Sequence, residues 1–318
     1  MRKVLLATTA LVMMGGVSAA YADISVSGGH ELKYQSWSKK TSTTANNSKV
    51  SSGATYTISG SSVLDNGMSI SGKIYSDNGA AFDTQGFSIS DDWGTIGVAD
   101  MESGDAFATA LDITDDEAYD GGAASTINTY APGDEYVANS TVSYLSPNIS
   151  GFQFSIGMKD TGKYSDATSY GAQYAMTAGD AAVTLKYAAS NTGKTTSSAT
   201  DEVDATSTAV VIGMAGATLT VAQNTADIGT TAEYEASGAS IAYKVSDALT
   251  VEAYSGETEN GKDTTGKFKF KDTAYGITYT VTPGMTLSVT HNSWDYTANA
   301  AASTDDGTNT AVALNVSF

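Results

Sequence analysis

The chain has 318 residues, a formal net charge of −19 and no cysteine, so disulfide scaffolds, thiol nucleophiles and cysteine-ligated metals are excluded. Acidic residues outnumber basic ones by 35 to 16, which argues against a nucleic-acid partner because such partners need a cationic face. His30 and His291 are the only histidines, so a His-Glu-x-x-His metal motif is excluded as well. Beyond the N-terminus, no apolar run is long enough to cross a membrane as a helix.

The N-terminus has the layout of a secretory signal peptide. Arg2 and Lys3 precede an apolar segment at 4–17, and an Ala-Tyr-Ala sequence follows just before Asp23. A membrane anchor is the alternative, but the apolar segment is short and polar sequence comes next. We expect cleavage after residue 22, which gives a signal peptide at 1–22 and an exported domain at 23–318. The mature chain then contains no arginine.

Past the signal peptide, apolar and polar residues alternate with the period of two that is typical of β-strands. In 152–159, Phe, Phe, Ile and Met fall on one face, while Gln, Ser, Gly and Lys fall on the other. Apolar residues do not recur at helical spacing in such segments. We expect sixteen strands, at 24–37, 49–60, 68–76, 85–90, 94–100, 140–146, 152–160, 168–177, 181–190, 205–214, 217–224, 232–245, 249–257, 271–282, 285–296 and 309–318.

The connections between these strands alternate in length. Seven are short and rich in Asn, Asp, Gly and Pro, and eight are long and polar. A soluble sandwich has no reason to place every long connection at one end, whereas an outer-membrane barrel has short periplasmic turns and long extracellular loops. The sequence therefore predicts an all-β fold, a 16-stranded antiparallel transmembrane β-barrel in the outer membrane of a Gram-negative cell.

The thin apolar face of the strands fits lipid better than the core of a soluble sandwich. We expect aromatic residues near the strand ends to form a girdle at the level of the lipid headgroups, namely Tyr34, Tyr75, Tyr144, Tyr187, Tyr254, Tyr279 and Tyr296, with Trp37 and Trp294. The alternative is that tyrosine serves here as an ordinary strand former. Strand parity puts His30 and His291 on the apolar face, where no catalytic base is expected, so we expect no enzyme.

Three short segments resemble a known family. They are the start of the chain at 1–11, the first strand sequence at 24–29, and the alternating end at 313–318, which closes on Phe318. With the layout of the whole chain, they resemble the general porins of alphaproteobacteria, the Rhodobacter-type family. The resemblance implies a trimeric, water-filled channel for small hydrophilic solutes and ions, and a third long loop that folds into the barrel. It also implies that the assembly machinery recognises Phe318, which is compatible with packing on lipid.

The longest connection, 101–139, is the third long loop and corresponds to the constriction loop of that family. It contains no lysine and nine acids: Glu102, Asp105, Asp112, Asp115, Asp116, Glu117, Asp120, Asp134 and Glu135. Strand parity predicts a set of lumen-facing bases: Lys33, Lys73, Lys159, Lys186 and Lys244. The wall clusters of the family are usually rich in arginine, which is missing here. We therefore expect a cation-preferring pore. The alternative is a solvated surface loop whose charge serves solubility.

We expect no cofactor. Asp112, Asp115, Asp116 and Glu117 supply oxygen ligands of the kind that calcium prefers, but the spacing and the glycine of an EF-hand loop are absent. The expected partners are outer-membrane lipid, further copies of the chain in a homotrimer, and small hydrophilic solutes and ions. A solute-specific channel is the closest alternative function. A secreted, acidic, β-rich surface protein is the more distant one.

Overall fold

The computed structural model describes residues 23–38, 48–77, 84–99, 107, 141–159, 167–191, 202–228, 232–260, 268–298 and 304–318. Sixteen strands account for most of them: β1 (Asp23–Trp37), β2 (Ser48–Val63), β3 (Ser69–Asp77), β4 (Thr84–Asp91), β5 (Gly94–Ala99), β6 (Val142–Leu145), β7 (Phe152–Lys159), β8 (Ala167–Ala178), β9 (Ala181–Asn191), β10 (Val203–Met214), β11 (Ala217–Ile228), β12 (Ala232–Lys244), β13 (Leu249–Asn260), β14 (Phe268–Thr282), β15 (Met285–Ala298) and β16 (Thr304–Ser317).

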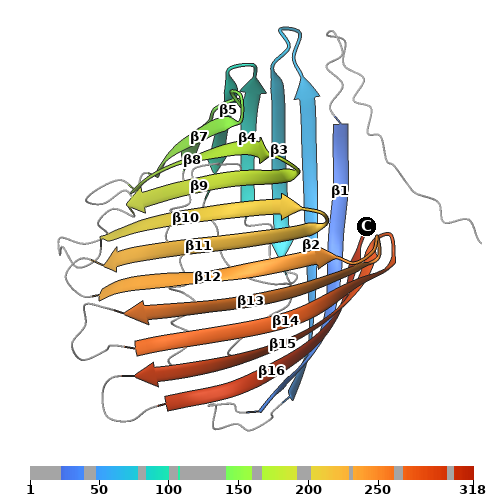
Figure 1. Cartoon of the computed structure of the whole chain (residues 1–318). Helices are drawn as coiled ribbons and strands as arrows, with labels where there is room; N and C mark the ends of the chain where they lie inside the picture. The colour runs from blue at the N-terminus through green and yellow to red at the C-terminus, as the bar shows by residue number, and fades with distance from the viewer. Residues whose placement is uncertain are drawn as a thin grey trace, which may run out of the picture.

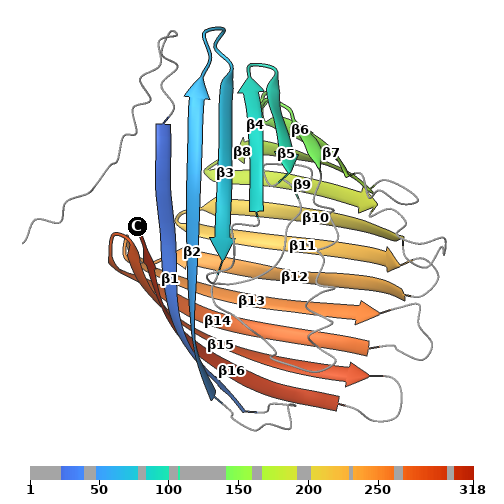
Figure 2. The same ribbon diagram turned by 180° about the vertical axis from the view of Figure 1, so that it is seen from behind.

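The strands form one closed antiparallel barrel. Each strand pairs with its neighbours in the chain, and β1 also pairs with β16, so the sheet has no free edge. Figure 1 shows β1 to β4 standing steeply while β9 to β16 run across the view, and Figure 2 shows the same arrangement from behind. The predicted fold is confirmed. In the part of the chain that the structure describes, no helix is long and apolar enough to span a membrane.

Several strands are longer than the sequence indicated. β13 continues to Asn260 instead of ending at 257, β14 begins at Phe268 instead of 271, and β16 begins at Thr304 instead of 309. The apolar alternation stops before the backbone pairing does. Glu259 and Lys269, for example, are still register partners although the side chains of outward parity at that level are charged. Backbone pairing therefore extends the wall of the barrel beyond its apolar band.

The seven short connections all lie at one end of the barrel, which we call the turn end, and we call the opposite end the loop end. Six of the seven contain a glycine with positive φ: Gly67, Gly94, Gly151, Gly179, Gly216 and Gly284. Gly151 shows a second reason for the choice, because a Cβ there would lie 2.1 Å from the carbonyl oxygen of Ala175. The predicted division of the connections between two ends of the barrel is confirmed, but the strict alternation in length is not, because β11 extends to Ile228 and leaves only 229–231 before β12 begins.

The two faces of the wall differ in character. On β1, Leu32 and Tyr34 are exposed, whereas Lys33 and Gln35, which alternate with them, are buried. Register partners on neighbouring strands point to the same side, so the pairing carries this parity around the whole barrel. The face with large exposed apolar side chains is the outer face. The face that carries Lys33 and Gln35 is the inner face, which borders the lumen.

Of the nine residues predicted for the aromatic girdle, four tyrosines lie on the outer face, as a girdle requires, and five residues lie on the inner face, where the prediction is wrong. Those on the outer face are Tyr34, Tyr144, Tyr187 and Tyr279. Those on the inner face are Tyr75, Tyr254, Tyr296, Trp37 and Trp294. The prediction failed for the second group because it used position along the strand and not parity. Trp37, Trp294 and Phe270 instead pack together as a buried cluster inside the barrel.

The last residue of the chain meets β1 at the seam between β1 and β16. The backbone amides of Gly28 and Phe318 each donate to the carbonyl oxygen of the other, at 3.0 Å. On the outer face, the Phe318 ring stacks on His30 with centroids 6.1 Å apart, and the hydroxyl of Tyr56 lies 3.0 Å from His30 Nε2. A Cβ on Gly28 would lie 2.9 Å from the Phe318 ring, so the glycine makes room for the terminal aromatic.

Candidate functional site

The lumen is the candidate functional site, and its most strongly charged described wall lies on β1 to β3. Lys33 is buried on the inner face of β1, and its Nζ lies 3.5 Å from Oε1 of Glu31. Lys73 lies on the inner face of β3, where its register partner is Gly86, which in turn pairs with Ala99. Lys73 therefore shares a row with the residue at which the longest connection begins. We call Lys33, Glu31 and Lys73 the charged wall.

The other predicted lumen lysines have different surroundings. Lys186 is on the inner face of β9, with Gln173 and Ala209 as its register partners. Lys244 also has inner parity, but it lies at the turn end and forms an ion pair of 3.0 Å with Asp247. Lys159 is the last residue of β7, and its side chain lies outside the described residues.

Register pairing also identifies inner-face charges that the sequence reasoning missed. Among the described strand side chains, the bases of inner parity are Lys33, Lys49, Lys73, Lys186 and Lys244. The acids of inner parity are Asp23, Glu31, Asp77, Glu252 and Asp272. Parity along the strands could have found all six residues that were missed. The described wall of the lumen therefore carries as many acids as bases.

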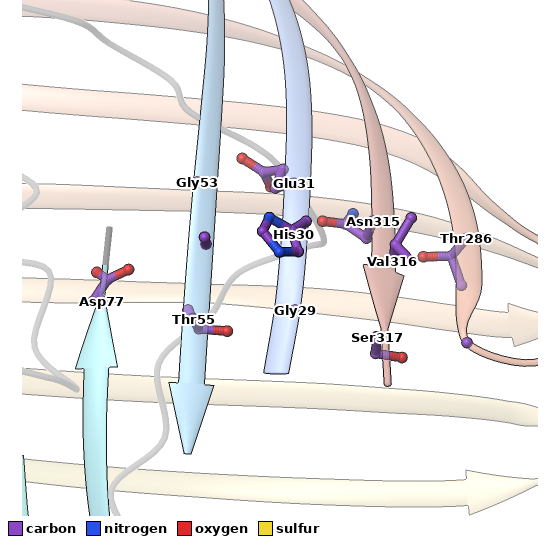
Figure 3. A pocket seen from close by; sticks show the side chains of 12 residues that line it. Gly29, His30, Glu31, Gly53, Thr55, Asp77, Thr286, Asn315, Val316 and Ser317 are labelled. Carbon is purple, nitrogen blue, oxygen red and sulfur yellow. The ribbon is translucent and has the colours of Figure 1, made fainter. Parts of the chain in front are cut away.

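A cavity of about 450 Å³ opens on the inner face where the turn end of β15 and β16 meets the loop end of β3. Figure 3 shows the side chains that converge on it from these strands and from β1 and β2. Its polar lining of inner parity consists of Glu31, Thr55, Asp77, Thr286, Asn315 and Ser317, and His30, whose parity is outward, also contributes to the lining. Carboxylates, hydroxyls and an amide offer a hydrated ion or a small solute several hydrogen-bonding partners. The cavity is thus polar space adjoining the charged wall.

The predicted constriction loop is described at one residue only. Its nine acids lie outside the described residues, and so do the four positions considered for calcium. Phe107 is described and is buried, at 3% exposure. Its ring approaches Gly171 on the inner face of β8. Within the described residues, no three His, Cys, Asp or Glu side chains come together in a way that could hold a metal ion.

Both histidines lie on the outer face, away from the lumen. His30 packs beside Tyr56 and Phe318 at the seam. His291 packs on Tyr275 with ring centroids 5.2 Å apart, and its Nδ1 lies 2.8 Å from the Thr310 hydroxyl. A general base must reach a substrate. These positions therefore serve the outer surface of the barrel and not a lumen reaction.

Comparison with known proteins places this geometry in context. A family described as Gram-negative porin matches residues 7–299. No curated protein matches the chain. An anion-selective porin from Comamonas acidovorans has a similar structure, with 12% identity, a TM-score of 0.65 and coverage of 93% of this chain and 100% of that chain.

Two further solved structures are similar at comparable levels. A loop-deletion mutant of OmpT, an outer membrane protein of Vibrio cholerae, is 14% identical with a TM-score of 0.65, and the match covers 93% of this chain and 99% of that chain. A mutant of the porin of Rh. blastica is 16% identical with a TM-score of 0.60, over 93% of this chain and 100% of that chain. At these identities the likeness concerns the fold.

Proposed function

The chain belongs to the Gram-negative porin family and forms a channel in the outer membrane; on that premise, we propose that it is a general diffusion pore that prefers cations over anions. The observation that carries this preference is the balance of charge on the lumen wall. Among the described strand side chains of inner parity, five lysines are matched by five acids. The wall therefore adds little net field along the pore.

Connection 101–139 breaks this balance, because it contributes nine acids and no lysine. We propose that it folds into the lumen and narrows the pore. Low-dielectric walls focus the field of charges in a confined aqueous path, so acids there attract cations and repel anions. The buried position of Phe107 supports an inward course of the connection.

A general pore is favoured over a solute-specific one by the state of the inner aromatic residues. A solute-specific path needs aromatic faces that a passing solute can touch. Trp37, Trp294 and Phe270 lie on the inner face, but they are only 3%, 3% and 6% exposed. These three pack on one another and offer little surface to a solute in transit, while the other inner aromatic residues of the predicted girdle, Tyr75, Tyr254 and Tyr296, are half-buried.

Three further features belong to the same proposal. We propose that the porin is of the Rhodobacter type, that it assembles as a homotrimer, and that residues 1–22 are removed on export. One solved relative, OmpT of Vibrio cholerae, is described as a trimer form. We also propose a channel without enzymatic activity, because both histidines serve the outer surface.

We propose no resident cofactor for the pore. A calcium ion would be the alternative, since the connection carries the oxygen ligands that calcium prefers, on Asp112, Asp115, Asp116 and Glu117. If the pore works without calcium, chelation with EGTA leaves single-channel conductance unchanged. A change in conductance that added calcium reverses would contradict this part of the proposal.

The test of the proposed function is a reversal potential. The detergent-purified mature protein is inserted into a planar bilayer that separates two concentrations of KCl. We expect ohmic conductance that scales with bulk salt and a reversal potential of the sign set by potassium. Anion preference would contradict the proposed selectivity. Saturable block by one sugar or amino acid would favour the solute-specific alternative.

A further inference from the structure

The longest connection leaves the wall of the barrel at a sharply turned residue. Ala99, the last residue of β5, has a φ of 53°, in the left-handed region that an alanine seldom adopts. Its N–H donates to the carbonyl oxygen of Thr141 at 2.9 Å, so the two ends of the connection 100–140 are joined at their base. Ala99 has inner parity on β5, because its partner Gly86 shares a row with Lys73.

Phe107, eight positions after Ala99, lies against β8, which is separated from β5 by β6 and β7 in the barrel. A Cβ built on Gly171 of β8 would lie 3.1 Å from Cδ2 of Phe107 and 3.4 Å from the hydroxyl oxygen of Ser155 on β7. Ser155 and Gly171 are register partners, and both have inner parity. The ring of Phe107 therefore lies on the inner face of β7 and β8, at a position where the wall has no side chain of its own.

This seat belongs to a larger surface of small inner side chains. One row of direct register partners contains Ser155, Gly171, Ala188 and Ser207, and it crosses β7 to β10. A neighbouring row contains Ser169, Ser190 and Ala205. The side chains of both rows are 5% exposed or less. We call these two rows the small-residue wall. It differs from the charged wall of β1 to β3, where Lys33, Lys73 and Glu31 project.

We propose that Phe107 is a positioning residue for the pore, with its ring seated against Gly171 on the small-residue wall. This inference rests on the proposed function, in which the connection narrows the lumen. Small side chains let the ring approach the backbone of the wall closely, and a larger residue at 171 would displace it. The open aqueous path then runs along the charged wall and past the cavity beside Glu31.

The placement can be tested without measuring conductance, because the chain contains no cysteine. Phe107→Cys combined with Ser155→Cys places two thiols at the seat. Phe107→Cys combined with Ser288→Cys is the matched control, since Ser288 is an equally buried inner serine on β15. Folded protein is selected by its heat-modifiable gel mobility and treated with a short bifunctional thiol reagent.

We expect cross-linking of the first pair to be about tenfold faster or more, because its two thiols have the higher effective concentration. Equal rates for the two pairs, or a faster rate for the Ser288 pair, would overturn the proposed seat. This outcome is independent of ion selectivity. A pore without cation preference whose thiols still cross-link at Ser155 would refute the proposed function and leave the seat intact.

A second measurement asks whether the seat matters for the pore. Phe107→Ala removes the ring, and Phe107→Leu keeps an apolar side chain that can occupy the seat. Phe152→Ala removes an exposed outer-face ring and serves as the control. We expect Phe107→Ala to lose the single conductance level and to show larger, noisier openings, while Phe107→Leu restores a defined level and Phe152→Ala conducts like the parent. Unchanged conductance in Phe107→Ala would show that the ring does not position the constriction.

Discussion

The two walls of the lumen use the same backbone pattern for opposite purposes. The small-residue wall on β7 to β10 presents serine, glycine and alanine and is buried. The charged wall on β1 to β3 presents Lys33, Glu31 and Lys73 and adjoins a polar cavity. Small side chains leave room for another segment to pack, whereas long charged ones need water or a partner. Pairing in the barrel is continuous across both walls, so only side chains distinguish a surface for packing from a surface for conduction.

The largest expected effect on ion selectivity concerns the acids of connection 101–139, which we propose to lie in the lumen. Changing Asp112, Asp115 and Asp116 to Asn, together with Glu117→Gln, removes four of the nine acids of the connection. An interaction on the order of 1 kcal/mol between a passing ion and these charges corresponds to a roughly fivefold drop in the cation-to-anion permeability ratio. Reversal potentials in a KCl gradient measure the ratio. An unchanged ratio would mean that the connection lies outside the conducting path.

A smaller change is expected when the charged wall itself is altered. Lys33→Met removes a buried lysine from the lumen, so cation permeability should rise relative to the parent, by about twofold for one charge. Lys244→Met removes a lysine at the turn end that is exposed and paired with Asp247, and it should change the ratio less. The same reversal-potential measurement compares the two. A larger effect at Lys244 would contradict the assignment of the charged wall.

The seam between β1 and β16 adjoins the charged wall, and damage there should lower stability without changing selectivity. Gly28→Ala forces a Cβ against the Phe318 ring and the carbonyl oxygen of Thr55, and we expect a loss of about 1–3 kcal/mol from overpacking. Gly60→Ala is the control, because a Cβ there would lie no closer than 3.9 Å to its nearest neighbour, the carbonyl oxygen of Asp23.

The measurement for the seam is the temperature at which gel mobility shifts to that of the unfolded chain, after refolding into detergent micelles. Refolding without the assembly machinery separates closure of the barrel from recognition of Phe318. Equal melting of the two alanine variants would show that the Phe318 ring does not need the space at Gly28.

The smallest effect is expected for charges on the outer face. Lys269 forms ion pairs with Glu257 and Glu259 across β13 and β14, at positions whose parity is outward. Lys269→Met should leave the permeability ratio unchanged, because these side chains do not face the lumen. A shift as large as that of Lys33→Met would contradict the division into inner and outer faces.

The sequence predicted what depends on local period and on turn chemistry. The alternation of apolar and polar residues predicted all sixteen strands and the inner parity of Lys33 and Lys73. Asn, Asp, Gly and Pro predicted the seven turns. The start of β16 at Thr304 was missed because backbone pairing needs no apolar side chain, whereas the start of β14 was missed although Phe268 and Phe270 alternate with lysines there. Tyr254 was predicted on the outer face, although its position relative to the apolar Leu249 and Val251 indicates the opposite face of β13.

Contacts between distant segments could not be predicted in the same way. Nothing near Phe107 in the sequence indicates that its ring meets Gly171, because that contact depends on the closure of the barrel and on the course of a long connection. The meeting of Phe318 with Gly28 has the same origin, since it requires β16 to pair with β1 at one register. Sequence period fixes which way a side chain points, but not what it meets.

The most direct test of the two-wall account is thiol accessibility in the open channel. Single variants Thr286→Cys in the cavity, Ala188→Cys on the small-residue wall and Leu287→Cys on the outer face are each exposed to a charged methanethiosulfonate reagent while current is recorded. We expect rapid modification with a stepwise fall in conductance for Thr286→Cys, and no change in conductance for the other two variants. Modification of Ala188→Cys as fast as that of Thr286→Cys, or an unreactive Thr286→Cys, would contradict the two-wall account.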